Sequence, residues 1–393
     1  MVEQGMKKIA FINQRYGMEV NGGSEYYTRL IAEKLSDEYE IEVLTTKAVS
    51  YEDWDNYYDA DEEDIRGVHV RRFPVAKKRQ VFWMKVLSKL ISTFRMNSRW
   101  LSNQWVKAQG PYTPALIRYI REHKDRYDVF VFVTYLYYPA VKGLPEVRDK
   151  AVLIPTAHDE PYIYFKTYED LFRSPRAFVY LTEEEKNFVN HLYNNATIPS
   201  TVTGVGVDIP KHIDSQSFRE KYAIEGDYLV YVGRVDTSKG CEQMVEYFTG
   251  YYQEHPGLTL VIMGQKFMDI PEIPAIRYLG FVSEQDKFDG IAGAAALWLP
   301  SKYESLSISV LEAMALAVPV LVNGGCEVLK GHCEKSGGGF AYMSQAQCIK
   351  YINALVHDDT LRQQMGEKAR RYVETNYSWT SVKNAIKEII EGI

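Results

Sequence analysis

The sequence lacks most features that mark a membrane-spanning, secreted or repetitive protein. Four cysteines in 393 residues, Cys241, Cys326, Cys333 and Cys348, are too few for a disulfide framework, so we expect reduced thiols in a cytoplasmic protein. No uncharged apolar run approaches the roughly 18 residues that cross a bilayer. The first apolar run ends at Asn13, too soon for a signal peptide. The composition, 46% hydrophobic and 25% charged, is typical of a globular protein with two or three domains.

Charge is distributed unevenly, although the formal net charge is only −6. Residues 52–64 hold eight acids and no Lys or Arg, whereas residues 65–121 hold 13 Lys or Arg and no acid. A nucleic-acid-binding protein would be basic as a whole, so we expect no nucleic acid as a partner. One basic segment on an acidic body is typical of a local docking surface.

Residues 77–107 of the basic segment support two interpretations. Helical spacing predicts an apolar face of Trp83, Val86, Leu87, Leu90, Ile91 and Phe94 and a polar face of Lys85, Lys89, Ser92 and Arg99. In the first interpretation the helix lies peripherally on an anionic membrane, each basic side chain contributing about 1 kcal/mol. In the second, the apolar face packs on the first domain and the basic face is solvated. The long absence of acids favours the first.

Short β-branched and aromatic runs alternate with longer amphipathic stretches, which predicts βα units and parallel sheets. The predicted strands of a first set are Lys8–Asn13, Ile41–Thr45, Val68–Arg72, Val129–Thr134, Ala151–Thr156, Ala177–Leu181 and Ser200–Gly204. Those of a second set are Tyr228–Val232, Leu258–Met263, Ile276–Leu279, Ala295–Pro300, Val318–Val322 and Gly339–Tyr342. We therefore predict an α/β fold of two doubly wound Rossmann-like domains, 1–205 and 206–375, facing each other across a cleft. Residues 376–393 are predicted to form a C-terminal helix that can cross back to the first domain.

A first glycine cluster lies between the first predicted strand and its helix. Gly22 and Gly23 let the backbone approach a ligand, and the helix start that includes Glu25 favours an anion. A Gly-Gly pair before a helix is also typical of a simple tight turn, and it is not the spaced glycine fingerprint of a dinucleotide fold.

A second cluster follows the first predicted strand of the second domain. Gly233 opens a turn from which Arg234 and Lys239 leave the sheet edge together. Two cations at this spacing suit a diphosphate. Arg can bind it with paired N–H donors of its planar guanidinium, and Lys can bind it as a point charge. A surface loop with two solvated charges is the alternative.

A third cluster surrounds two glutamates in a small and apolar stretch. Glu304 is predicted in a loop and Glu312 two turns into the following helix. The backbone amides of Ser305, Leu306 and Ser307 would then lie at the helix start and could hold a phosphate. A buried carboxylate needs donors, and paired sugar hydroxyls supply them. A salt bridge within the domain is the alternative for Glu312.

These clusters, in this order over nearly the whole chain, resemble the retaining glycosyltransferases of family 4, which have the GT-B fold. The resemblance implies that Arg234 and Lys239 bind the diphosphate of the donor. It also implies that Glu304 binds hexose hydroxyls and Glu312 the ribose.

The resemblance extends to positions outside the three clusters. His158, followed by Asp159, stands where the family has a histidine that contacts the transferred sugar near its reacting carbon. Gly264, Phe281 and Val282 match segments whose backbone holds the nucleotide base. Many relatives have Gly-Phe-Gly after the first glutamate, whereas this chain has Ser-Leu-Ser, which leaves the donor sugar open.

The function implied is transfer of a hexose from a nucleoside diphosphate sugar, UDP first and GDP second, to a glycan or a lipid-diphosphate-linked glycan acceptor. Retention would follow from attack on the face of the leaving group, with the cations and the helix start stabilising the diphosphate, so that no metal or other cofactor is required. A nucleotide-sugar epimerase or hydrolase on the same fold, and a non-catalytic scaffold that binds nucleotide sugars, are the alternatives.

Three other patterns are weighed against structural explanations. Asp53, Asp55, Asp59 and Asp61 resemble Asp-x-Asp metal motifs, but they fall in an acidic loop, where a metal role is not expected. The segment 326–333 offers Cys, His and Cys without a Cys-x-x-Cys pair, so packing is favoured over zinc and no role is assigned. Thr182 followed by Glu185 predicts a helix cap.

Overall fold

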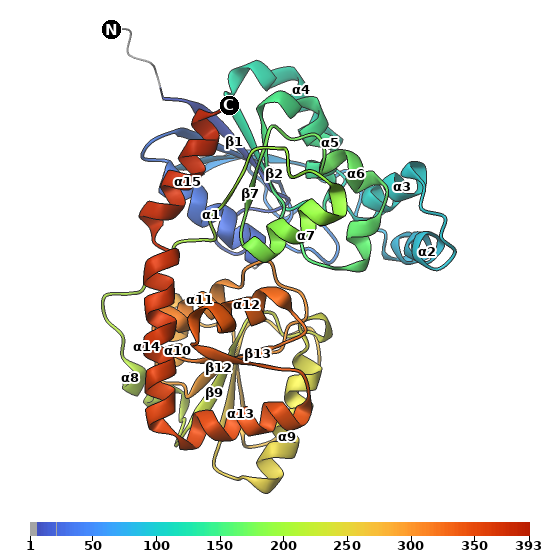
Figure 1. Cartoon of the computed structure of the whole chain (residues 1–393). Coiled ribbons are helices and arrows are strands. Elements are labelled where there is room, and N and C mark those ends of the chain that lie inside the picture. Colours follow the sequence, from blue (N-terminus) through green and yellow to red (C-terminus); the bar gives the residue numbers. More distant parts are fainter. Residues whose placement is uncertain (1–5, 21) are drawn as a thin grey trace. The chain divides into compact units, whose positions relative to one another are not determined.

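The computed structural model describes residues 6–20 and 22–393, which fall into two units. The first unit runs to Gly204 and also contains Val382–Ile393, and the second is Val205–Ser381 (Figure 1). Each unit has its own sheet with helices around it. The prediction of an α/β chain with two Rossmann-like domains is confirmed.

The sheet of the first unit has eight strands in the order β3-β4-β2-β1-β5-β6-β7-β8. Their bounds are β1 Lys8–Ile12, β2 Glu40–Thr46, β3 Glu62–Ile65, β4 Val68–Phe73, β5 Val129–Val133, β6 Ala151–Ile154, β7 Ala177–Tyr180 and β8 Ser200–Val202. Neighbouring strands are parallel except for β3 and β4. The central strands are buried on both faces, which explains their continuous apolar runs.

The edge strand β3 was not predicted, because its sequence is mostly acidic. Glu62 and Glu63 form ion pairs with Arg71 and Arg72 on the adjacent strand β4. The acidic segment therefore neutralises the first part of the basic segment. Lys78 pairs with Asp55 of the acidic segment in the same way.

The helices of the first unit are α1 Gly23–Leu35, α2 Val81–Ser92, α3 Arg99–Gln109, α4 Pro114–His123, α5 Tyr138–Gly143, α6 Thr167–Leu171 and α7 Glu183–Tyr193. Short 3-10 helices occupy Lys124–Arg126, Leu144–Glu146, Arg148–Lys150 and Pro161–Tyr164. Helices α2 and α3 pack on each other at one side of the unit (Figure 1).

The predicted single apolar face from Trp83 to Phe94 is wrong, because the helix ends at Ser92 and the chain restarts in α3. Ile91 is buried, and Leu87 packs against the core, as the second interpretation expected. Trp83 and Phe94 are exposed, as the first one required. The structure thus shows packing of part of the segment on the first unit, whereas membrane binding stays a prediction.

The sheet of the second unit has six parallel strands in the order β11-β10-β9-β12-β13-β14. Their bounds are β9 Tyr228–Val232, β10 Thr259–Met263, β11 Ile276–Gly280, β12 Ala296–Leu299, β13 Val320–Asn323 and β14 Gly339–Tyr342. The helices are α8 Ser215–Tyr222, α9 Cys241–Glu254, α10 Glu284–Ala292, α11 Ile308–Ala315, α12 Glu327–Ser336, α13 Gln345–His357 and α14 Asp359–Asn376, with a 3-10 turn at Thr237–Lys239. All six predicted strands of this unit are present.

The last helix, α15 Trp379–Glu391, begins in the second unit, and its residues from Val382 onward belong to the first. Its apolar side, with Val382, Ile386 and Ile390, is buried. On its polar side, Lys383 and Lys387 both pair with Glu38. These contacts attach the end of the chain to the first unit. None of the helices in the described part of the chain is long and apolar enough to span a bilayer.

Candidate functional site

The second unit places its charged loops at the point where the strand order reverses. From β9 the chain proceeds outward through β10 and β11, and from β12 outward through β13 and β14. The carboxyl ends of β9 and β12 therefore flank the switch point, the position at which doubly wound sheets bind ligands. The predicted loops with Arg234 and Glu304 follow these two strands directly.

The glycines at these strand ends allow the backbones to lie close together. Gly264, which follows β10, has a φ of +136°, and a Cβ there would lie 1.9 Å from the carbonyl oxygen of Gly233. The Gly233 N–H donates to Met263 at 3.0 Å, and the Gly264 N–H donates to Gly280 at 2.7 Å. Gly233 and Gly264 thus join three strand ends into one edge without side chains, which suits close approach of a ligand.

The two predicted diphosphate-binding cations each have an acidic partner. Lys239 Nζ lies 2.7 Å from Glu304 Oε1, so the loops after β9 and β12 are joined by an ion pair. Arg234 pairs with Asp236, whose side chain also accepts from the Lys239 backbone N–H at 3.0 Å. Burial alone would raise the pKa of Asp236, but a hydrogen bond from Ser238 and the charge of Arg234 lower it. Each of the two cations thus has a carboxylate partner. A diphosphate could take the place of these carboxylates as the partner of Arg234 and Lys239.

Helix α11 begins at Ile308, three residues later than the phosphate-binding prediction assumed. The first-turn amides therefore belong to Ile308, Ser309 and Val310 rather than to Ser305, Leu306 and Ser307. Ser307 is the N-cap residue and has a φ of +69°, in the left-handed region that favours glycine.

Glu312 lies inside α11, as predicted, and is 4% exposed. Its Oε1 is 2.6 Å from Lys287 Nζ of α10. Burial raises the pKa of the Glu312 carboxyl, and the charge of Lys287 opposes this rise. The structure therefore contains the salt bridge that the sequence left as an alternative. Phe281 and Val282 follow β11, and Phe281 is 73% exposed.

In the first unit, the glycine cluster surrounds a buried ion pair. Glu25 is buried and accepts from Arg15 Nη2 at 2.6 Å, from Gln14 at 2.7 Å and from Ser24 at 2.8 Å. Burial opposes ionisation, but the Arg15 charge and these hydrogen bonds lower the pKa of Glu25. A Cβ at Gly22 would lie 2.2 Å from the Glu25 carboxylate, whereas one at Gly23 would meet nothing within 4 Å. The carboxylate thus leaves no room for a side chain at position 22. Asn21 lies outside the described residues.

His158 and Asp159 lie in the loop after β6. His158 Nε2 is 3.6 Å from Glu160 Oε1, which accepts from the Tyr135 hydroxyl at 2.5 Å. Asp159 is exposed and accepts from Tyr164 at 2.6 Å.

Glu185 anchors the start of the His158 loop. The predicted cap is present, because Thr182 Oγ1 accepts from the Glu185 N–H at 3.1 Å. The Glu185 carboxyl, however, also accepts from the backbone N–H groups of Ala157, at 2.5 Å, and of Leu181, at 2.7 Å. Burial raises the pKa of Glu185 to about 8, although these bonds oppose the rise.

Residues 214–372 match the family model described as "Glycosyl transferases group 1". The match covers most of the second unit but less than half of the whole chain. Among curated proteins, glycogen synthase of Mycobacterium tuberculosis is 25% identical over 174 residues, which are 41% of this chain and 41% of that protein. The match thus spans less than half the length of that relative.

Two solved structures are similar over 98% of this chain. Sucrose-phosphate synthase of Thermosynechococcus elongatus has a TM-score of 0.72 at 14% identity, with 98% of that chain covered. HepE of Anabaena in complex with UDP and glucose has a TM-score of 0.71 at 14% identity, with all of that chain covered. At this identity the likeness concerns the fold, which confirms the predicted GT-B class.

Sequence reasoning missed several residues that contact the predicted site residues or their loops. Asp236 lies two residues from Arg234 in the same motif and could have been found from that spacing. Lys287 precedes Glu312 by 25 residues on another helix, and Glu185 was recognised only as a cap. The structure joins Lys239 to Glu304 within the second unit, but the predicted substrate contacts stay predictions.

The metal alternatives find no support in the part of the chain that the structure describes. No group of three or more His, Cys, Asp or Glu side chains there is arranged to hold a metal ion. Asp55 pairs with Lys78 and Asp61 with Lys47. All four cysteines are buried and free.

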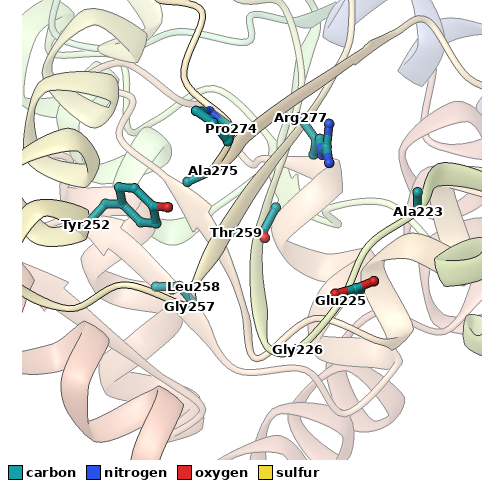
Figure 2. A pocket seen from close by; sticks show the side chains of 10 residues that line it. All are labelled: Ala223, Glu225, Gly226, Tyr252, Gly257, Leu258, Thr259, Pro274, Ala275 and Arg277. Carbon is teal, nitrogen blue, oxygen red and sulfur yellow. The ribbon is translucent and has the colours of Figure 1, made fainter.

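A surface hollow of about 510 Å³ lies at the other edge of the second sheet (Figure 2). It is lined by Ala223, Glu225, Gly226, Tyr252, Gly257, Leu258, Thr259, Pro274, Ala275 and Arg277. Most of these residues precede or begin β9, β10 and β11, so the hollow is at the amino ends of the strands. Figure 2 shows Glu225 and Arg277 on one side of the hollow and Tyr252 on the other. The hollow is therefore separate from the Lys239–Glu304 pair, which lies in loops at the carboxyl ends of the strands.

Proposed function

We propose that the protein is a retaining glycosyltransferase that moves a hexose from a nucleoside diphosphate sugar to a glycan or lipid-linked glycan. The observation that carries this proposal is the Lys239–Glu304 pair, which joins the loops after β9 and β12 beside Arg234 at the switch point of a group 1 domain. A cation for the diphosphate and a carboxylate for the sugar are thereby adjacent.

In the proposed reaction, the bond between the anomeric carbon and the diphosphate oxygen breaks, and a bond to the acceptor hydroxyl oxygen forms on the same face. The acceptor proton passes to an oxygen of the leaving diphosphate. Arg234 and Lys239 stabilise the negative charge that grows on this group, as do the first-turn amides of α11. These side chains supply the positive charge, so the reaction as proposed needs no metal.

Binding of the donor would exchange partners within the site. Lys239 leaves Glu304 for the diphosphate, which frees that carboxylate to accept from sugar hydroxyls. We propose that the donor is a UDP-sugar, with a GDP-sugar as the second choice. The similar structure of HepE is a complex with UDP and glucose, which supports this order.

The test is turnover of a panel of UDP- and GDP-sugars, with and without glycan acceptors, measured as nucleotide release and as product. R234A and K239A should each lower turnover about 100- to 1000-fold, the effect of losing one donor to a developing anion. K221A is the control, because Lys221 is an exposed cation of α8 paired with Asp286. Near-normal turnover in both R234A and K239A would contradict the proposal. Nucleotide release that no acceptor accelerates would instead favour a hydrolase or an epimerase.

We also propose that α2 and α3 bring the enzyme to an anionic membrane that carries its acceptor. Five large apolar side chains of α2, α3 and the residues between them are more than half exposed: Phe82, Trp83, Phe94, Met96 and Trp100. Basic side chains lie among them in the sequence, and no acid does. Aromatic rings with flanking cations suit the interface of an anionic bilayer.

Flotation with phosphatidylserine vesicles tests this surface. The double variant W83A/W100A should lose most of the bound fraction, whereas Y57A should retain it, because Tyr57 is an exposed aromatic residue in the acidic segment. Binding should weaken with salt and should be absent from phosphatidylcholine vesicles. Equal flotation of both variants, or none with the wild type, would contradict membrane docking.

A further inference from the structure

The cysteine- and histidine-containing segment to which the sequence assigned no role lies beside the Glu304 loop. His332, on α12, is 2% exposed. Its Nε2 is 2.9 Å from the carbonyl oxygen of Leu306, and its Nδ1 is 3.1 Å from the hydroxyl of Tyr372. Because a carbonyl oxygen can only accept, Nε2 is the donor in the first of these bonds.

The N-terminal end of the same helix contacts the chain two residues before Leu306. Cys326, the N-cap residue of α12, is buried with its Sγ 4.0 Å from the carbonyl oxygen of Glu304. Leu306 is itself 3% exposed. The backbone from Glu304 to Leu306 is therefore fixed by α12 at two carbonyl groups, while the carboxylate of Glu304 projects toward Lys239.

The turn has a reason to need this support. Ser307 directly follows Leu306 and has a φ of +69°, a conformation that costs energy in any residue other than glycine. Such strain persists only where the surrounding structure holds the backbone, and the bond from His332 is made one residue before it.

We propose that His332 is a positioning residue for the sugar part of the donor. Its bond to Leu306 fixes the 304–307 turn, so that the Glu304 carboxylate and the first amides of α11 are presented in one arrangement. This inference rests on the proposed function, because the ligand of Glu304 is the hexose of that reaction. His332 does not itself touch the substrate in this account.

Hydrogen–deuterium exchange tests the positioning without any substrate. In H332L, amides of residues 305–310 should exchange about 3- to 10-fold faster, the effect of one lost hydrogen bond. In H332Q, whose side-chain amide can still donate to Leu306, they should stay near the wild-type rate. C333A is the control, because it removes a buried atom from the next residue of α12. Unchanged exchange in a folded H332L, or an equal change in C333A, would overturn the proposal.

Kinetics test the consequence for the donor. H332L should lower kcat/KM for the nucleotide sugar about 10- to 100-fold, as expected for a displaced catalytic carboxylate, while affinity for free UDP changes less than about threefold. H332Q should recover most of this loss. Equal losses in UDP binding and in turnover would overturn the inference. Failure of the wild type to turn over any nucleotide sugar would contradict the proposed function, and the exchange result would still decide whether His332 holds the turn.

Discussion

Replacing Glu185 by glutamine should change how the stability of the first unit depends on pH. The Glu185 carboxyl is 2% exposed, and burial raises its pKa from 4.5 to about 8. Between these values the folded protein holds a proton that the unfolded chain releases. The free energy of unfolding should therefore fall as the pH rises through this interval.

The magnitude follows from the size of the pKa shift. Each pH unit in the interval costs up to about 1.4 kcal/mol, so the whole interval costs about 5 kcal/mol of unfolding free energy. The contribution is fully present below about pH 4.5 and is lost as the pH rises through about 8. Glutamine does not titrate, so E185Q removes this slope. The glutamine side chain has one acceptor oxygen, so the N–H group of either Ala157 or Leu181 loses its partner. This loss lowers the free energy of unfolding of E185Q by about 1–3 kcal/mol, an offset that does not change with pH and adds to the difference in slope.

Urea unfolding of the wild type and E185Q from about pH 5 to 8 measures the difference between the two profiles. The disadvantage of E185Q should shrink as the pH rises. E183Q is the control, because Glu183 is an exposed carboxyl in the same helix turn, and any change that the two variants share comes from the helix start. Parallel profiles for the wild type and E185Q would refute the reasoning.

Two further predictions concern the second unit. G264A should lower the free energy of unfolding by more than about 3 kcal/mol, because its Cβ would lie 1.9 Å from the Gly233 carbonyl oxygen. G257A should cost only about 1–2 kcal/mol, since its φ is also positive but nothing lies within 4 Å, and equal costs for the two variants would contradict this explanation. K287M should cost about 3–5 kcal/mol by leaving the Glu312 charge buried and unpaired, and the double variant K287M/E312Q should recover most of it in thermal unfolding.

The strands could be predicted because the buried parallel strands are continuous apolar runs with clear ends. The acidic strand β3 could not, since it forms only where Glu62 and Glu63 meet Arg71 and Arg72 of the adjacent strand. The break between α2 and α3 was also missed, because helical spacing continues in the sequence from Trp83 past the end of the helix at Ser92.

Much of the candidate site could be predicted because its charged residues follow strands directly. The carboxyl ends of parallel strands meet at one edge, so Arg234 and Lys239 were expected to leave the sheet edge together, whereas the pairing of Lys239 with Glu304 was not predicted. The partners that hold the site were not predicted, because the contact depends on tertiary packing. Lys287 reaches Glu312 from another helix, and His332 reaches the Glu304 loop from a segment with no recognisable motif.

Calorimetric titration of UDP and GDP into the protein tests the central claim most directly: that the loop after β9 binds the diphosphate of an activated sugar. We predict saturable binding of at least one of these nucleotides by the wild type and K221A. In K239A and R234A the affinity should fall about 10- to 100-fold, the effect of losing one charge-assisted hydrogen bond. Absence of binding to the wild type, or equal affinities in all four proteins, would contradict the account.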